Sequence, residues 1–229
     1  AGAVKDFDIE DLIADEEMVV VVSHSGYIKR IPSDTYRQQH RGGKGVIGMG
    51  TKDDDYIEHI FVASAHQYIL FFTDYGKCYW LKVHQIPQAS RTSQGRAIIN
   101  LIGCDTEEKV KAFVSVKEFN DTDFIVMSTR NGIIKRSALS MYSRPRKGGI
   151  YAIEIREKDE LIQAKISHGD QDIILATHNK DKRKEMMATL IALNVNILSL
   201  EDFPLVGLAV GDVPVALVVV EAHQRPEQP

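Results

Sequence analysis

The sequence contains few of the residues that build disulfide scaffolds or membrane spans. Its 229 residues include two cysteines, Cys78 and Cys104, which do not make a disulfide framework. The longest apolar stretch, 213–220, contains Pro214 and falls far short of the roughly 20 residues that a membrane helix needs. With no charged leader before an apolar segment, we expect a soluble, cytoplasmic protein.

The sequence also lacks the constellations that carry catalysis. No paired carboxylates flank a glycine-bounded loop, no Ser-His-Asp set accompanies a nucleophile turn, and no Cys/His spacing suits a metal. We therefore expect no catalytic residue, no metal and no cofactor. Tyr79 and Trp80 belong to a strand-like run and are expected in the core. The histidines are scattered, and we expect surface or interstrand roles for His24, His59, His66, His84 and His168.

Charge is distributed unevenly along the chain. The formal net charge of −4 argues at first against a polyanionic partner. Yet Lys and Arg outnumber Asp and Glu in windows 23–50, 75–103 and 129–151, which carry net charges of +4, +4 and +6. Acidic residues gather in the intervening segments. This periodic segregation indicates that one class of surface is basic and another acidic.

The same period appears in the hydrophobic pattern. VVVVSHSGYIKR (19–30), ILFFTDYGKCYWLK (69–82) and FIVMSTRNGIIKR (124–136) each show an apolar run, a short turn ending in glycine, and a second run ending in a cation. Gly26, Gly76 and Gly132 lie 50 and 56 residues apart. A tight turn that needs positive φ between two such runs predicts a β-hairpin in each repeat.

A basic loop follows each hairpin. Residues 41–45, 91–95 and 144–148 all read Arg, two residues, Lys or Gln, Gly, and lead into the runs VIGM, AIINLI and IYAIEI. An acidic turn and a fourth run complete each unit, and four short strands in about 50 residues are typical of a propeller blade. The pattern predicts a mainly β protein: a lead-in over 1–16, blades over 17–65, 66–118 and 119–170, the start of a fourth over 171–179, and a short α/β extension over 180–229.

Equivalent loops of a radial array lie on one edge, so the array predicts a curved basic track for an anionic partner. Basic loops without aromatic interleaving suit duplex phosphates better than single strands. A flexible solvated turn, or a propeller fragment that binds proteins, would carry similar letters. The candidate DNA-binding residues are Lys29, Arg30, Arg37, Gln39, His40, Arg41, Gly42, Gly43, Lys44, Gly45, Lys82, Arg91, Arg96, Lys135, Arg136, Arg144, Arg146 and Lys147.

Residues 8–49 resemble the start of the DNA gyrase A C-terminal domain family. QHRGGKG (39–45) matches six of the seven positions of that family's gyrase-A box, with His40 in place of the first Arg. The resemblance extends over residues 5–179 and implies a β-pinwheel, which is a propeller-like array whose blades share strands. It further implies double-stranded DNA wrapped around the basic rim in support of negative supercoiling.

The family's other functions lie in other segments. The resemblance places the cleaving tyrosine and the ATPase elsewhere, so we expect no enzyme activity and no cofactor in this segment, whereas the parent enzyme uses ATP and Mg²⁺. It implies that the parent forms a gyrase A homodimer with gyrase B as its partner. Family members usually carry six blades, which leaves half a rim here and predicts weak, partial bending of DNA.

The pattern changes after residue 179. Apolar residues in 180–193 recur with a helical period, and 173–204 resembles the first βαβ unit of the inosine triphosphate pyrophosphatase family. That resemblance makes Thr177, Asn179 and Lys182 candidate phosphate-binding residues, while a basic helix end is the structural alternative. The family's catalytic half has no counterpart, so we expect no pyrophosphatase activity. We interpret the junction as a recombined or frameshifted coding sequence, followed by a loose tail.

Overall fold

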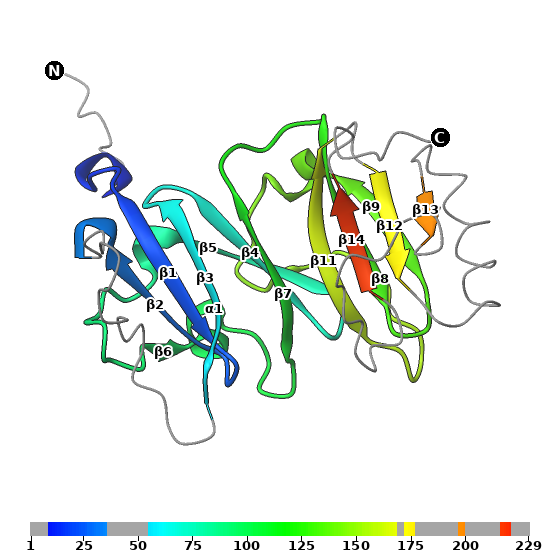
Figure 1. Ribbon diagram of the computed structural model, residues 1–229, viewed down its shortest axis with the longest axis horizontal. Helices are drawn as coiled ribbons and strands as arrows, with labels where there is room; N and C mark the ends of the chain where they lie inside the picture. Colours follow the sequence, from blue (N-terminus) through cyan, green and yellow to red (C-terminus); the bar gives the residue numbers. More distant parts are fainter. Residues whose placement is uncertain (1–8, 36–54, 169–171, 177–196, 200–215, 221–229) are drawn as a thin grey trace, which may run out of the picture. The chain divides into compact units, whose positions relative to one another are not determined.

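The computed structural model describes residues 9–35, 55–168, 172–176, 197–199 and 216–220, and strands dominate them (Figure 1). The chain divides into two compact units. The first unit comprises residues 1–70, 80–106 and 115–118, and the second comprises 71–79, 107–114 and 119–229. In the described part of the chain, no helix has the length and hydropathy to cross a membrane.

The first sheet is built on the first predicted hairpin. Its strands are β1 (Glu17–Ser23), β2 (Tyr27–Pro32), β3 (Ile57–Ser64) and β6 (Arg96–Ala97), in the order β3-β1-β2-β6, and every neighbouring pair is antiparallel (Figure 1). Gly26 has φ +80°, and its amide donates to the Ser23 carbonyl to close the turn. The β-branched run of β1 favours a strand with both faces covered, and Val19 and Val21 pack with Ile31.

The second and third sheets repeat this plan. β4 (Tyr68–Thr73), β5 (Lys77–Lys82), β7 (Val110–Val116) and β10 (Ile150–Tyr151) form a sheet in the order β10-β5-β4-β7. β8 (Asp123–Thr129), β9 (Ile134–Ala138) and β11 (Leu161–His168) form another in the order β11-β8-β9. Gly76 and Gly132 also have positive φ. The three predicted hairpins are therefore confirmed.

The short strands that follow the basic loops pair with the preceding repeat. β6 comes from the second repeat and pairs with β2 of the first, with Ile28 opposite Arg96. β10 comes from the third repeat and pairs with β5 of the second, with Cys78 opposite Ile150. Sheets and sequence repeats therefore do not coincide, because the segments 17–65 and 66–118 each receive an edge strand from the next segment. In the described residues the third sheet has three strands, where we expected four.

The runs after the loops are only partly extended. AIINLI was expected to be a strand, but only Arg96 and Ala97 are, and the short helix α1 (Ile98–Ile102) follows and ends at Gly103 with φ +63°. In IYAIEI only Ile150 and Tyr151 form a strand. Single 3₁₀ turns complete the regular structure, at η1 (Ile9–Leu12), η2 (Ser33–Thr35), η3 (Val83–Gln85) and η4 (Leu139–Tyr142).

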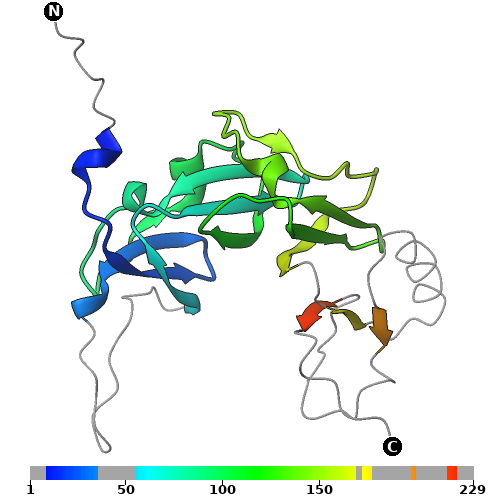
Figure 2. The ribbon, with the colours of Figure 1, turned by 90° about the horizontal axis from the view of Figure 1, so that it is seen from above.

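A fourth sheet lies toward the end of the chain (Figure 2). β12 (Asp172–Ala176) pairs in parallel with β13 (Ile197–Ser199) and antiparallel with β14 (Ala216–Val220). β12 lies in the segment 171–179, where we expected a fourth unit to open, and its parallel pairing with β13 requires a crossover connection rather than a tight turn. That this segment starts a fourth blade stays a prediction. β14 also lies in the segment that we expected to be a loose tail.

The hydrophobic runs of the repeats supply the core. Phe72 meets the ring of Tyr142 at 6.0 Å between centroids, and Ile125 and Met127 of β8 are fully buried. Tyr79 is buried, as predicted, while Trp80 is half-buried. These cores fix the strands that carry the basic loops.

Candidate nucleic-acid interface

Part of the predicted interface lies outside the described residues. The residues concerned are those of the gyrase-A box and the arginine that precedes it, namely Arg37, Gln39, His40, Arg41, Gly42, Gly43, Lys44 and Gly45. The three candidate phosphate-binding residues Thr177, Asn179 and Lys182 also lie outside the described residues. Their proposed roles remain predictions.

Five of the predicted cations are exposed, four on the basic loops and Arg96 on the short strand β6 that follows the second loop. Arg91 and Arg96 belong to the first unit, and Arg144, Arg146 and Lys147 belong to the second. Within the described residues, none of their side chains forms a hydrogen bond or an ion pair. Unengaged guanidinium and ammonium groups on exposed loops are suited to contact phosphate oxygens.

A close-approach glycine ends each described loop. Gly95 has φ +85°, and a Cβ there would lie 2.5 Å from the Ile28 carbonyl oxygen. Gly149 has φ +71°, and a Cβ there would lie 2.9 Å from the Cys78 carbonyl oxygen. We aligned Gly148 with Gly95, but a Cβ on Gly148 would meet nothing within 4 Å. The structural equivalent of Gly95 is therefore Gly149, and the third loop is one residue longer.

Lys29 requires a correction, because it is buried rather than available to DNA. Its side chain has no exposed surface. Its Nζ donates to the carbonyl oxygens of Ser90 at 2.9 Å, Arg91 at 2.6 Å and Ser93 at 2.8 Å. An ammonium group has three N–H donors, so all three are satisfied. Burial lowers the pKa of Lys29.

Four other predicted cations are engaged in contacts within the fold. Arg30 Nε donates to the Ile86 carbonyl oxygen at 2.7 Å, and Lys135 Nζ donates to the Ala152 carbonyl oxygen at 2.7 Å. Lys82 pairs with Glu10 and lies 4.7 Å from the ring centroid of Tyr68. Arg136 lies 3.4 Å from the ring centroid of Phe124, and burial lowers its pKa. These contacts hold the four side chains against the fold, although Lys135 stays exposed.

One buried network in the second unit was missed by the sequence reasoning. Lys77 Nζ donates to Glu108 Oε1 at 2.7 Å, and the Tyr79 hydroxyl donates to the same oxygen at 3.0 Å. Burial and the bond to Glu108 raise the pKa of Tyr79 to about 12. Burial alone would raise the pKa of Glu108, but the hydrogen bonds outweigh it and lower that pKa. The only sequence signal was an acid placed between two strands.

This network packs against the end of the third basic loop (144–148). A Cβ on Gly149 would lie 2.9 Å from Cε1 of Tyr79, so the tyrosine ring lies directly under the end of the loop. Lys77 lies 5.8 Å from the ring centroid of Tyr151, the residue with which it is paired in the sheet. Glu108 therefore fixes two side chains that touch the loop and its strand.

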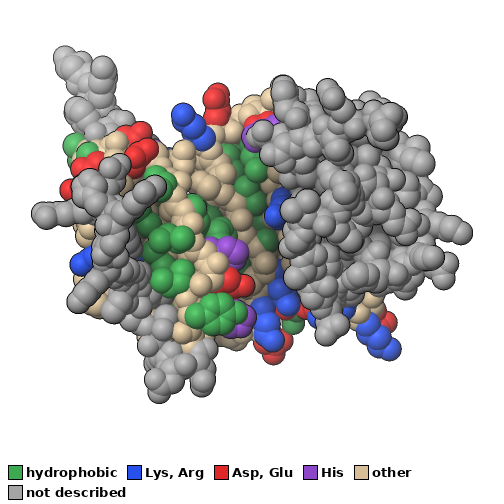
Figure 3. Space-filling model, in the orientation of Figure 1, with side chains coloured by type: hydrophobic (Ala, Val, Ile, Leu, Met, Phe, Trp, Pro, Cys, Tyr) green, Lys and Arg blue, Asp and Glu red, His purple; other side chains and the backbone are tan. Residues whose placement is uncertain are grey.

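The basic edge that we predicted joins loops of different units. Arg91 belongs to the first unit, Arg144 to the second, and Arg41 lies outside the described residues. The common edge stays a prediction. On the face shown in Figure 3, hydrophobic side chains gather over β3, where Ile60 and Val62 are more than half exposed. An apolar strand is not suited to bind phosphate, so the candidate DNA contacts lie on the basic loops.

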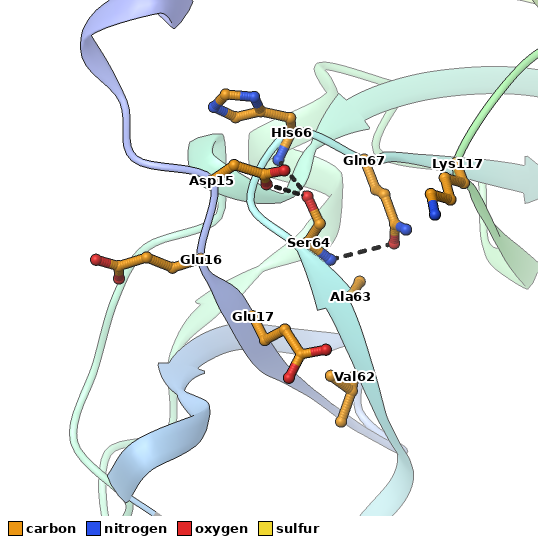
Figure 4. Close-up of a pocket in the computed structure, with 9 residues that line it drawn as sticks. All are labelled: Asp15, Glu16, Glu17, Val62, Ala63, Ser64, His66, Gln67 and Lys117. Carbon is orange, nitrogen blue, oxygen red and sulfur yellow. Dashed lines mark hydrogen bonds between the residues drawn. The ribbon is translucent and has the colours of Figure 1, made fainter.

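A pocket of about 490 Å³ in the first unit brings acidic side chains together with Ser64 and His66 (Figure 4). Ser64 Oγ donates to the Asp15 carboxylate, and the backbone amide of His66 donates to Ser64 Oγ. The imidazole Nε2 of His66 instead lies 2.8 Å from the Ile13 carbonyl oxygen. The ring is thus not placed as a base for Ser64, and the three residues do not form a nucleophilic triad.

The chain matches the family model described as DNA gyrase C-terminal domain, beta-propeller, over residues 17–64, 67–111 and 123–168. These three segments correspond to the three repeats, and the chain belongs to this family.

Curated relatives agree with this assignment. The chain is 48% identical over 176 residues to the DNA gyrase A protein of Clostridium acetobutylicum, an alignment that covers 77% of this chain and 21% of that protein. It is 37% identical over 227 residues to the DNA gyrase A protein of Staphylococcus epidermidis, covering 99% of this chain and 25% of that protein. The chain thus spans about a fifth to a quarter of these relatives. The second alignment continues past residue 179, where we expected the resemblance to end.

Two solved structures share the fold. The C-terminal domain of DNA topoisomerase IV superposes with a TM-score of 0.61 at 23% identity, over 71% of this chain and 49% of that one. The DNA gyrase A C-terminal domain superposes with a TM-score of 0.55 at 24% identity, over 70% of this chain and 51% of that one.

Proposed function

We propose that this chain is a DNA-binding module that bends duplex DNA along its basic loops without reading sequence. The observation that carries the proposal is the pair of loops at 91–96 and 144–147, which expose five unengaged cations on a scaffold of the gyrase C-terminal family. Phosphate contacts position a protein on DNA and carry no base information. Binding is therefore expected to be indifferent to sequence and strongly dependent on salt.

The wider role follows from the relatives. We propose that the chain serves a cytoplasmic type II topoisomerase, in which a gyrase A homodimer and gyrase B provide strand passage with ATP and Mg²⁺. In that setting the module delivers a bent duplex to the cleaving part of the enzyme and supports negative supercoiling. We expect the module itself to have no topoisomerase activity and no cofactor of its own.

The test is a titration of fluorescently labelled duplex by anisotropy at several salt concentrations. Each phosphate neutralised contributes about 0.9 to the slope of log K against log salt, so five cations predict a slope of about −4.5. Two duplexes of equal length and unrelated sequence should give the same affinity. No binding at low salt, or a slope near zero, would remove the proposal.

A loop variant with a matched control separates specific contacts from general charge. Replacing Arg144, Arg146 and Lys147 with Gln should reduce the magnitude of the salt slope by about 2.7. Lys165→Gln changes an exposed cation on β11, outside the three basic windows, and should leave the slope unchanged. An equal effect per charge removed would indicate non-specific attraction.

A further inference from the structure

Lys29 is a charged side chain buried in the middle of a segment that looked like a DNA-binding stretch. Within residues 9–35 and 55–168 no carboxylate pairs with it, and three backbone carbonyls accept hydrogen bonds from its ammonium group. Burying an ammonium group away from water is costly unless its donors are satisfied. Such an arrangement points to a role that only a cation in this position can fill.

The three carbonyls lie in the middle of the second basic loop, between two ends that are fastened by backbone bonds. At the start, the Arg30 amide donates to the Pro87 carbonyl and the Ala89 amide donates to the Arg30 carbonyl, both at 3.1 Å. At the end, Gly95 is held against Ile28, and β6 joins β2. Lys29 reaches the span between these ends.

We propose that Lys29 is a positioning residue that fixes the conformation of loop 90–95 and thereby holds Arg91 in place to contact duplex phosphate. The proposal rests on the proposed function. Lys29 Nζ binds the carbonyl of Arg91 itself, so the backbone from which the exposed guanidinium projects is tied to the core of the first sheet. A cation counted from sequence as a DNA contact thus acts beneath the surface.

The corresponding position of the second repeat has a related task. Lys29 is the third residue after the hairpin glycine Gly26, and Tyr79 is the third after Gly76. Tyr79 lies under Gly149, at the end of the next basic loop, with its hydroxyl anchored on Glu108. In both repeats this strand position therefore supports the loop that the following repeat supplies.

The first experiment measures the loop directly by hydrogen exchange. Lys29→Met keeps the length and apolar volume of the stem but removes the three donors. We expect exchange of the Ser93 amide, which donates to the Ser90 carbonyl at 3.2 Å, to accelerate about tenfold, which corresponds to about 1.4 kcal/mol, while the amides of Ala89 and Ile98 keep their rates. Lys165→Met is the control. Unchanged exchange of the Ser93 amide in a folded Lys29→Met variant would overturn the proposal.

The second experiment tests whether Lys29 acts through Arg91, by comparing salt slopes of duplex binding. Arg91→Gln should reduce the slope by about 0.9, and adding Lys29→Met should reduce it no further. Additive reductions would show that Lys29 contacts phosphate itself and would overturn the inference. If the unaltered chain fails to bind duplex, the proposed function fails, while the hydrogen-exchange result still tests whether Lys29 fixes the conformation of loop 90–95.

Should Lys29→Met not fold, the unaltered chain decides the question by NMR. Ammonium protons bound by three carbonyls exchange slowly enough to give a resolved Nζ signal at neutral pH, with couplings to the loop carbonyls. A Lys29 ammonium that exchanges as fast as that of exposed Lys165 would contradict the proposal that Lys29 holds loop 90–95.

Discussion

Glu108 has an outsized effect for a single side chain, because it accepts hydrogen bonds from both Lys77 and Tyr79. Glu108→Gln should destabilise the second unit by about 2 kcal/mol. This is less than the 3–5 kcal/mol of a fully buried pair, because 24% of the Lys77 side chain is exposed. Thermal unfolding at neutral pH measures the loss, with exposed Glu154→Gln as the control.

The same substitution predicts a pH dependence. The pKa of Glu108 is lowered by folding, so its contribution is complete above its unfolded value of about 4 and is lost as pH falls through the folded value. The stability difference between the unaltered chain and Glu108→Gln should therefore shrink in acid. A difference that grows below pH 4 would show that the carboxylate is not stabilised by its partners.

Two adjacent glycines allow a sharp test of backbone geometry. Gly149→Ala should destabilise by about 2 kcal/mol, because a positive φ and a Cβ at 2.9 Å from the Cys78 carbonyl oxygen both oppose it. Gly148→Ala should change stability by less than about 0.5 kcal/mol, since nothing lies within 4 Å of its Cβ. Denaturant midpoints of the two variants measure this contrast. The reverse order would restore the alignment of Gly148 with Gly95.

At the scale of the element, the short strands β6 and β10 connect consecutive repeats. Each has two residues, yet each fixes the end of a basic loop to the preceding sheet. Ile150→Pro should remove the donor of β10 to β5 and increase proteolysis in 144–149, because proline cannot join the ladder. Mass spectrometry of a limited tryptic digest locates the cuts, and Arg156→Gln provides a variant outside the loop. Unchanged protection of 144–149 would mean that Gly149 alone holds the loop.

At the scale of the whole molecule, the question is how far a duplex can be bent. Smooth bending of a site of 20–30 base pairs costs roughly 1–6 kcal/mol, which contacts along a continuous basic edge must offset. We expect partial bending by this chain. Energy transfer between dyes at the ends of a short duplex measures it, and full wrapping would contradict this expectation.

The role of the gyrase-A box (39–45) in DNA bending can be tested in the same assay. Arg41→Ala together with Lys44→Ala should remove the bending while leaving thermal unfolding unchanged, if the box contacts DNA as the family resemblance implies. A double variant that bends DNA as well as the unaltered chain would indicate that the box is a solvated turn.

The local features of this protein could be predicted from its sequence. Hairpins depend on an apolar run, a glycine turn and a second run within a dozen residues, and the three glycine turns were found correctly. The membership of the family also follows from repeated local motifs, which the family model matches repeat by repeat. Charge segregation likewise predicted loops with exposed cations, as Arg91 and Arg144 show.

Non-local contacts decided the rest. From the sequence we expected each blade to be one continuous segment. Which sheet receives β6 or β10 depends on strand edges that come together only on folding, so the sequence could not show that these strands join the preceding sheet. Lys29 and Arg91 have the same formal charge, but burial under a loop 61 residues away makes one an internal clamp and leaves the other at the surface. Pattern sets the strands and their turns, whereas tertiary packing determines which cations remain free to bind a partner.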